Sequence, residues 1–253
     1  MMTIDLSGKK AVVTGGSRGV GRAVALMLAR AGTHVGISYQ SRKDDADAVV
    51  ADLQRMGVQA WAQRGDLANA ADAERLFDKA RQAFNTIDIF VGNAGLWEPA
   101  DVPLSQMSDG QWRRTMAVNL DSVFYTMRAA IGMMNNGGRI VLVGSTAGQR
   151  GEANHGDYAA SKGALISLVK GVCIELASRD ITVNCIAPGW IETEMAAIPY
   201  SDGGRKRIEA NIPLGRVASV DDVAGPVLFL CSPLARHITG EILNVNGGSV
   251  LCG

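Results

Sequence analysis

Residues 9–31 read KKAVVTGGSRGVGRAVALMLARA, and this stretch decides the fold. It opens with a short apolar run, Lys9–Thr14, which predicts a buried strand. Its second half, Arg22–Ala31, has apolar residues at helical spacing and is followed by a glycine, a common helix end. The turn between them holds Gly15, Gly19 and Gly21, which allow a tight turn and close approach of a ligand to the backbone. Strand, glycine turn and helix in this order predict a dinucleotide site.

The rest of the chain repeats the alternation of strand and helix. Apolar runs predict strands at His34–Ser38, Val58–Arg64, Ile87–Val91, Arg139–Val143, Ile181–Ile186 and Ile242–Val245. Helical periodicity predicts helices at Asp44–Met56, Ala70–Phe84, Asp109–Met134, Asp157–Ser178 and Val220–Leu230. The strands are continuously apolar, which is typical of a parallel sheet covered on both faces. No linker or internal repeat divides the sequence, so we predict one α/β domain over residues 1–253.

Composition excludes several classes of function. Lys and Arg together number 25, as do Asp and Glu, so no net charge attracts nucleic acid or an anionic membrane surface. The N-terminal residues MMTIDLSGKK lack an apolar core of signal-peptide length, and no run reaches the length of a membrane span. Cysteines and histidines are scattered, which argues against a metal site and for a reduced, cytoplasmic protein: Cys173, Cys185, Cys231, Cys252, His34, His155 and His237.

The second predicted strand indicates which dinucleotide binds. An NAD site places a carboxylate near the end of this strand to hold the ribose 2′-hydroxyl, but here the first carboxylate is Asp44. Instead Arg18 lies in the glycine turn beside Ser17 and Val20, while Ser41 and Arg42 end the strand. Arginine binds phosphate through two donors and stays charged, so we predict NADP(H). The alternative is that both arginines are solvated surface charges.

Three side chains later in the chain suggest acid–base chemistry. Tyr158 and Lys162 are four residues apart, so on a helix they project from one face. A nearby ammonium favours a phenolate, and we therefore expect Lys162 to lower the pKa of Tyr158 and make it a general acid or base. Ser145 could hydrogen-bond the same substrate oxygen. Taken alone, most pairs at this spacing are a half-buried aromatic beside a solvated amine.

Together these motifs resemble the short-chain dehydrogenase/reductase family over nearly the whole chain. The family pattern TGxxxGxG reads Thr14–Gly21, and its serine and YxxxK match Ser145, Tyr158 and Lys162. Further matches follow in order: Asp66-Leu67 at the adenine, Asn93-Ala94-Gly95 after the fourth strand, Asn119 in the active site, Pro188-Gly189 after the sixth strand, and Ile191 and Thr193 at the nicotinamide.

The resemblance implies a Rossmann-like doubly wound sheet of about seven strands and hydride transfer between nicotinamide and a carbonyl carbon. In that scheme Ser145 holds the substrate oxygen and Tyr158 exchanges its proton. Lys162 binds the nicotinamide ribose and lowers the tyrosine pKa, and Asn119 holds a water that links Lys162 to solvent. The resemblance also implies a homotetramer, and the apolar tail Val250-Leu251-Cys252 is consistent with a covered surface.

Within the family the sequence most resembles the 3-oxoacyl-acyl-carrier-protein reductases, through ITVNCIAP at Ile181–Pro188 and IPLGR at Ile212–Arg216. The substrate would then be a small-molecule or carrier-bound carbonyl. Of two basic positions that such reductases tend to offer an acidic carrier, Arg179 is present and the other is Asn136. A sugar or other secondary-alcohol dehydrogenase stays open, as does a non-catalytic dinucleotide-sensing subunit, which the intact catalytic residues disfavour.

A segment from Glu192 to Arg216 is expected to form the substrate lid. It contains the basic run Arg205-Lys206-Arg207, which could meet a phosphopantetheine or an acidic carrier, although a solvated helix face is the preferred reading. Trp97 and Trp190 are expected to flank the pocket, either against the substrate or as wall residues.

Overall fold

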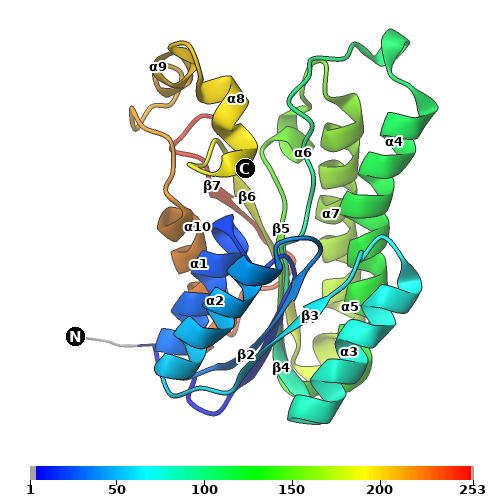
Figure 1. Ribbon diagram of the computed structural model, residues 1–253, viewed down its shortest axis with the longest axis vertical. Helices are drawn as coiled ribbons and strands as arrows, with labels where there is room; N and C mark the ends of the chain where they lie inside the picture. Colours follow the sequence, from blue (N-terminus) through cyan, green and yellow to red (C-terminus); the bar gives the residue numbers. More distant parts are fainter. Residues whose placement is uncertain (1–3, 252–253) are drawn as a thin grey trace.

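Seven parallel strands form one sheet in the order β3-β2-β1-β4-β5-β6-β7 (Figure 1). This computed structural model describes residues 4–251, so the predictions for the first residues and for Cys252 lie outside the described residues. The strands are β1 Lys10–Val13, β2 His34–Tyr39, β3 Ala60–Arg64, β4 Ile87–Gly92, β5 Met134–Val143, β6 Thr182–Pro188 and β7 Ile242–Val245. The predicted single-domain α/β fold with a seven-stranded parallel sheet is confirmed.

Helices cover both faces of the sheet. One face carries α1 Gly19–Arg30, α2 Lys43–Arg55 and α10 Val220–Cys231, and the other carries α3 Ala70–Phe84, α4 Asp109–Met116, α5 Ser122–Met133 and α7 Gly156–Glu175 (Figure 1). Alternate residues of β1 face opposite cores, because Ala11 and Val13 pack with α1 and α10 while Val12 packs with α3 and α5. All three are fully buried, which explains the continuous apolar run in the sequence.

Short helices lie near the carboxyl ends of the strands or in connections. They are α6 Ala147–Arg150, α8 Ala197–Tyr200, α9 Gly204–Glu209, η1 Leu104–Gln106, η3 Ala177–Arg179, η4 Glu194–Ala196 and η5 Pro233–Ala235. β2 and β4 flank β1. The chain adds β2 and β3 on one side of β1 and then returns to add β4 on the other side. Ligands of such folds bind at the crevice that this reversal creates beyond the carboxyl ends of the strands. No helix within residues 4–251 is long and apolar enough to cross a membrane.

Several element ends shift by one to three residues from the sequence prediction, and two stretches differ in kind. The long helix expected at Asp109–Met134 contains a π turn, η2 Ala117–Asp121, between α4 and α5. β5 begins at Met134, whereas the sequence predicted a helix as far as Met134 and a strand only from Arg139. The pairing register of β4 with β5 shifts at this point, Gly137 has a φ of +75°, and Asn135 donates to Asp88. The asparagines and glycines therefore form an irregular strand start that local propensity alone reads as a turn.

Candidate active site

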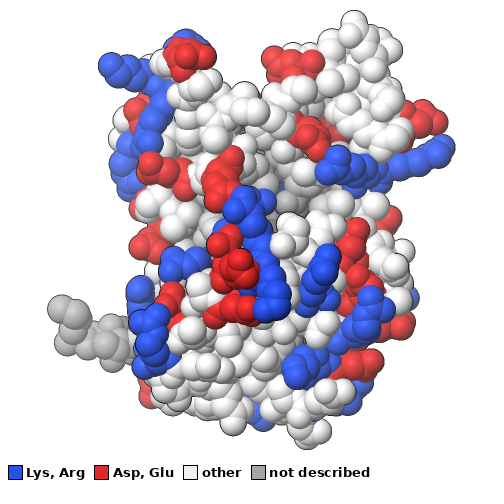
Figure 2. Space-filling model, viewed as in Figure 1, with Lys and Arg blue, Asp and Glu red and all other residues white. Residues whose placement is uncertain are grey.

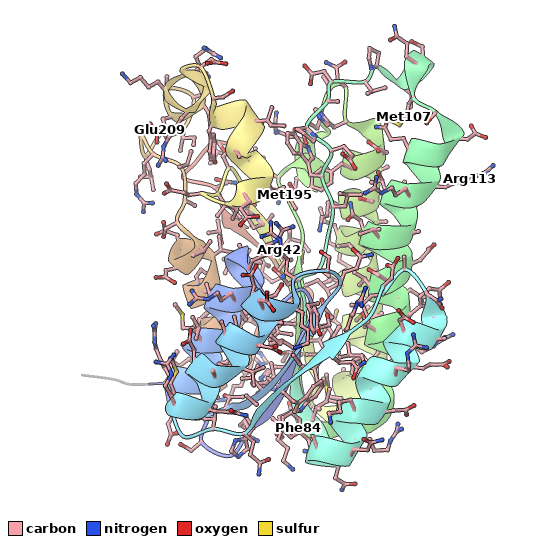
Figure 3. The ribbon with its side chains drawn as sticks, in the orientation of Figure 1. Arg42, Phe84, Met107, Arg113, Met195 and Glu209 are labelled. Carbon is pink, nitrogen blue, oxygen red and sulfur yellow. The ribbon has the colours of Figure 1, made fainter. Side chains whose placement is uncertain are left out.

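A cleft of about 1090 Å³ lies at the carboxyl ends of the central strands. It is lined by the predicted catalytic residues Ser145, Tyr158 and Lys162, and by all predicted cofactor residues except Gly21: Gly15, Ser17, Arg18, Gly19, Val20, Ser41, Arg42, Asp66, Leu67, Asn93, Ala94, Gly95, Tyr158, Lys162, Pro188, Gly189, Ile191 and Thr193. Figure 3 places Arg42 and Met195 on this side of the sheet, with Phe84 at the opposite end. Segments far apart in the sequence thus meet where the topology predicts a ligand.

The glycine turn forms the floor of the cleft. Gly15 and Gly19 have φ angles of +65° and +53°, which other residues rarely adopt. Gly21 packs beneath the turn, since a Cβ there would lie 2.2 Å from the carbonyl oxygen of Gly15. Asn93 fastens the turn to β4 by donating from Nδ2 to the Thr14 carbonyl at 2.9 Å. Gly21 therefore shapes the predicted cofactor site without lining it.

The start of α1 suits a pyrophosphate. Arg18 is the residue before the helix and makes no side-chain cap, and the first turn contains no acidic residue. The first N–H groups of a helix lack partners within the helix, and the helix dipole favours an anion there. The helix terminus and the positive-φ glycines together fit the phosphates of a dinucleotide.

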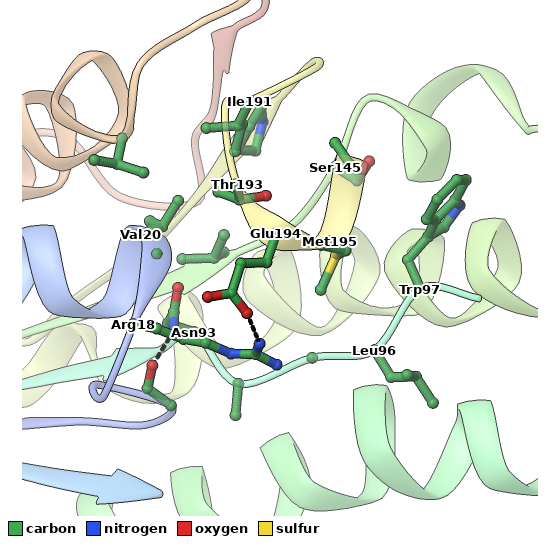
Figure 4. Close-up of a pocket in the computed structure, with 18 of the residues that line it drawn as sticks. Arg18, Val20, Asn93, Leu96, Trp97, Ser145, Ile191, Thr193, Glu194 and Met195 are labelled. Carbon is green, nitrogen blue, oxygen red and sulfur yellow. Dashed lines mark hydrogen bonds and ion pairs between the residues drawn. The ribbon is translucent and has the colours of Figure 1, made fainter. Parts of the chain in front are cut away.

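Two arginines converge at the end of the cleft beside β2. Nη1 of Arg18 and Nη2 of Arg42 both donate to Oε2 of Glu194, at 2.5 and 2.8 Å, and Figure 4 shows the contact of Glu194 with Arg18. Ser41 lies beside them in the cleft wall. Because both guanidinium groups can reach one anionic oxygen, the pair fits a phosphate on the adenosine ribose.

The predicted adenine contact lies next to this end. Leu67 is buried, and the Asp66 backbone N–H donates to Oδ2 of Asp72 at 2.7 Å. Oδ1 of Asp66 accepts from the N–H of Ala68 at 3.2 Å. The Asp66 carboxylate is therefore held in its loop at the edge of the cleft.

Ser145 and Tyr158 are brought together at the other end of the cleft. Ser145 follows β5 and Tyr158 lies in the first turn of α7. Burial raises the pKa of Tyr158 to about 12, the hydrogen bond with Ser145 opposes this rise, and the charge of Glu152 adds to it. The expectation that the pKa of this phenol is lowered is wrong, because desolvation outweighs every favourable contact.

Lys162 also lies in the cleft, but its nearest partner is not the tyrosine hydroxyl. Its Nζ donates to the carbonyl oxygen of Val143 at 2.9 Å and lies 5.8 Å from the centroid of the Tyr158 ring. Burial lowers the pKa of Lys162 to about 8, with a smaller opposing effect from Cys185. The two side chains share one face of α7, as their spacing predicts, and the ammonium faces β5.

Asn119 does not line the cleft; it lies beneath it in the π turn. Its side chain is fully buried, accepts from the N–H of Leu96 at 2.7 Å, and donates to the Leu96 carbonyl and the Ser161 hydroxyl at 2.8 and 3.1 Å. One turn earlier, Thr115 donates to the buried carboxylate of Asp157 at 2.7 Å. Two polar contacts therefore join this helix to α7 on either side of Tyr158.

Gly95 fits between Asn119 and Lys162. A Cβ at this position would lie 3.3 Å from both Oδ1 of Asn119 and Nζ of Lys162. The Asn-Ala-Gly segment therefore passes close to the predicted catalytic residues because its last member has no side chain.

Aromatic rings line the part of the cleft where the sequence predicts the substrate pocket. Trp97 and Trp190 both line it and meet edge to face, with centroids 5.9 Å apart. His155 stacks on Trp97 at 4.8 Å, and Tyr200 donates its hydroxyl to the Ile191 carbonyl at 2.9 Å. The two tryptophans are therefore held by neighbours as wall residues that a substrate can contact.

Basic residues considered for carrier binding have other partners. Arg205 pairs with Glu192 and Glu209, which raises its pKa. Arg179 donates to the carbonyls of Ile131 and Met134 and lies before β6, at the end of the sheet opposite the cleft. On the face in Figure 2, basic and acidic side chains are intermingled. Within this chain, neither arginine forms a free basic surface beside the cleft.

Glu194 and Glu152 are among the carboxylates of the cleft that sequence reasoning missed. Glu194 follows Thr193 directly, so its position near the nicotinamide segment could be predicted from the sequence. Its contact with the distant arginines could not be predicted in this way. Glu152 lines the cleft near Tyr158, and burial raises its pKa. Among residues 4–251, no group of three His, Cys, Asp or Glu side chains is arranged to hold a metal ion.

Comparison with known proteins gives consistent matches. Residues 15–249 match a family model described as enoyl-(acyl carrier protein) reductase. The 3-oxoacyl-[acyl-carrier-protein] reductase FabG of Escherichia coli is 39% identical over 247 residues, covering 97% of this chain and 98% of that protein.

Solved structures match the chain over nearly its whole length. A Brucella melitensis short-chain dehydrogenase/reductase described as glucose/ribitol dehydrogenase superposes with a TM-score of 0.93 at 32% identity, covering 99% of this chain and 100% of that one. A blue fluorescent protein from a metagenomic library, in complex with NADPH, has a TM-score of 0.92 at 36% identity, covering 98% and 100%.

Fold and cleft together define an oxidoreductase built on a dinucleotide-binding α/β sheet. The chain belongs to the short-chain dehydrogenase/reductase family, which confirms the resemblance drawn from its motifs.

Proposed function

We propose that this protein uses NADP(H) to reduce a carbonyl group to a secondary alcohol, with a 3-oxoacyl thioester, free or carried by acyl carrier protein, as substrate. The observation that carries the proposal is one cleft with a hydrogen-bonded Ser145–Tyr158 pair at one end and the convergent Arg18 and Arg42 at the other. The E. coli relative named as a 3-oxoacyl-carrier-protein reductase and the structural neighbour bound to NADPH support it.

The cofactor would lie along the cleft from the arginines to Tyr158. Gly15, Gly19 and the start of α1 would hold its pyrophosphate, and Ile191 and Thr193 would hold the nicotinamide amide. Arg18 and Arg42 would bind the 2′-phosphate that distinguishes NADP from NAD. When bound, the reduced cofactor supplies the hydride that the carbonyl carbon accepts.

Tyr158 would serve as the proton donor in reduction. Its raised pKa keeps the phenol protonated at neutral pH, and the alkoxide formed by hydride addition is a stronger base than a phenolate. Ser145 would hold the carbonyl oxygen within reach of the phenol. The Lys162 ammonium, buried on the same helix face, would stabilise the phenolate left after transfer and bind the nicotinamide ribose. Asn119 would position Leu96 and keep its predicted role in a water relay to Lys162.

A sugar or other secondary-alcohol dehydrogenase is the second candidate. Glu152 favours it, because its carboxyl group lies in the cleft and could accept hydrogen bonds from a substrate with several hydroxyl groups. The structural neighbour described as glucose/ribitol dehydrogenase is in line with this alternative.

Steady-state kinetics test both candidates. Acetoacetyl-CoA with NADPH, followed by loss of absorbance, is expected to turn over with a lower KM for NADPH than for NADH. Substitution of both Arg18 and Arg42 by Met should raise the KM for NADPH by about tenfold or more, since charged hydrogen bonds contribute about 1.5–3 kcal/mol each, and leave NADH nearly unaffected. Turnover of sugars with none on the thioester would favour the second candidate.

The segment Glu192–Arg216 is proposed as the substrate lid. It carries Met195 and Pro199 into the cleft, while Ile198 is exposed, and its α9 helix is held by the pairing of Arg205 with Glu192. A tryptophan fluorescence change of Trp190 on substrate binding would support closure, and an unchanged signal with saturating substrate would oppose it.

The predicted homotetramer remains a proposal. Trp112, Phe124 and Ile174 lie exposed on α4, α5 and α7, the helices that the family uses for assembly. Light scattering is expected to give about four times the chain mass, with Phe124→Glu reducing it. A cytoplasmic location is proposed on the free, buried thiols of Cys173 and Cys185 and is testable by cell fractionation.

A further inference from the structure

The carboxylate of Glu194 lies in the predicted cofactor site, where it binds the two arginines expected to hold a phosphate. Its Oε2 accepts from Arg18 at 2.5 Å and from Arg42 at 2.8 Å, and the carboxylate points toward Arg18 in the cleft (Figure 4). All three side chains are about half exposed, with Glu194 at 60%. The contact joins three segments, because Arg18 precedes α1, Arg42 precedes α2 and Glu194 begins η4.

Charge around the two arginines is already balanced. Nη1 of Arg42 lies 3.6 Å from Asp45, so two guanidinium groups face two carboxylates, Glu194 and Asp45. A phosphate monoester brings one to two further negative charges to the same donors. If the Glu194 carboxylate and a phosphate bound the same N–H groups together, their negative charges would be in contact. One of the two anions must therefore displace the other.

We propose that Glu194 competes with the 2′-phosphate of NADP for Arg18 and Arg42, and so sets how strongly the protein prefers NADP over NAD. This inference rests on the proposed NADP site. An exposed ion pair contributes only about 0.2–1 kcal/mol, so the phosphate can displace the carboxylate. A cofactor without the phosphate leaves the Glu194 contacts in place and gains nothing from the arginines. Glu194 therefore weakens NADP binding selectively.

Its position makes Glu194 a specificity residue rather than a surface charge. The preceding residue, Thr193, and the following one, Met195, both line the cleft, so the carboxylate is carried on a segment that faces the bound molecule along its length. Glu192, two residues earlier, also lines the cleft but pairs with Arg205 instead. The two glutamates offer a matched comparison on one segment.

Calorimetric titration of the purified protein with adenosine 2′,5′-bisphosphate and with AMP separates the phosphate from the rest of the cofactor. Glu194→Gln should bind the bisphosphate about three- to tenfold more tightly than wild type, as expected for releasing two exposed ion pairs, with AMP affinity unchanged. Glu194→Lys should tighten it further. The matched control, Glu192→Gln, removes the same charge and should shift the bisphosphate affinity by less than about twofold.

The outcomes distinguish this inference from the proposed cofactor. If wild type binds the bisphosphate no more tightly than AMP, the NADP assignment fails. If it prefers the bisphosphate and Glu194→Gln leaves that preference unchanged, or Glu192→Gln changes it equally, only the competition is refuted. In a chain that also carries Arg18→Met and Arg42→Met, Glu194→Gln should have no effect, and a persisting gain would contradict competition for these donors.

Discussion

The ammonium of Lys162 donates to the backbone carbonyl of Val143 at 2.9 Å, which ties α7 to the end of β5 inside the protein. Burial lowers the pKa of this lysine from 10.5 to about 8. Between these values the unfolded chain binds more protons than the folded one, so the contribution of Lys162 to the free energy of unfolding rises with pH. Below about pH 8 the full cost of the buried charge is present.

Lys162→Met should remove this pH dependence. The difference in unfolding free energy between wild type and the variant is expected to move in favour of wild type from pH 8 toward pH 10.5, and to stay constant below pH 8. Urea denaturation at several pH values measures it. Lys170→Met, at an exposed position on the same helix, is the matched control. If the difference in unfolding free energy between wild type and Lys162→Met did not change with pH, folding would not lower the pKa of Lys162.

Tyr158→Phe should abolish most of the turnover with a much smaller effect on cofactor affinity. The change removes the proton donor and keeps the ring, so kcat is expected to fall by about 10²–10⁴-fold. Initial rates with NADPH and fluorescence titration of NADPH measure the two effects separately. Tyr125→Phe on α5 removes a hydroxyl outside the cleft and should retain full activity. Substantial activity in Tyr158→Phe would refute the proposed proton donor.

Gly21→Ala should destabilise the protein although the residue lies outside the cleft. Its new Cβ would lie 2.2 Å from the Gly15 carbonyl oxygen and 2.5 Å from Nδ2 of Asn93, so the glycine turn must shift. The expected cost is about 1–3 kcal/mol, as for other overpacked sites, with weaker dinucleotide binding. Gly132→Ala is the matched control: nothing lies within 4 Å of its Cβ on α5, and alanine should stabilise this helix by about 0.5–1 kcal/mol. Equal stability of the two variants would contradict the packing role of Gly21.

Asn119→Asp should lower stability more than an exposed asparagine change. The aspartate keeps the acceptor for Leu96 but loses both donated hydrogen bonds and places a carboxylate in a fully buried site. A loss of about 2–4 kcal/mol is expected in chemical denaturation, because buried partners are left unsatisfied. Asn154→Asp, on an exposed loop, should stay within about 0.5 kcal/mol of wild type. A small loss at Asn119 would show that the site admits water.

Features read from neighbouring residues were predictable. The glycine turn and the i, i+4 spacing of Tyr158 and Lys162 are local features that the sequence shows directly, whereas their meeting at one cleft was implied by the family resemblance. The sign of the Tyr158 pKa shift was not predictable, because desolvation comes from segments that only the folded chain brings together. The Glu194 contact depends likewise on three distant segments, and the irregular start of β5 depends on pairing with β4.

The paired contacts of Thr115 with Asp157 and of Asn119 with Ser161 have a consequence for how this site evolves. Tyr158 lies between these two α7 residues, so the neighbouring helix holds the turn of α7 that carries the phenol. Mutations on that helix can therefore retune the reaction without touching a reacting group, so drift in catalytic rate can originate one helix away from the chemistry.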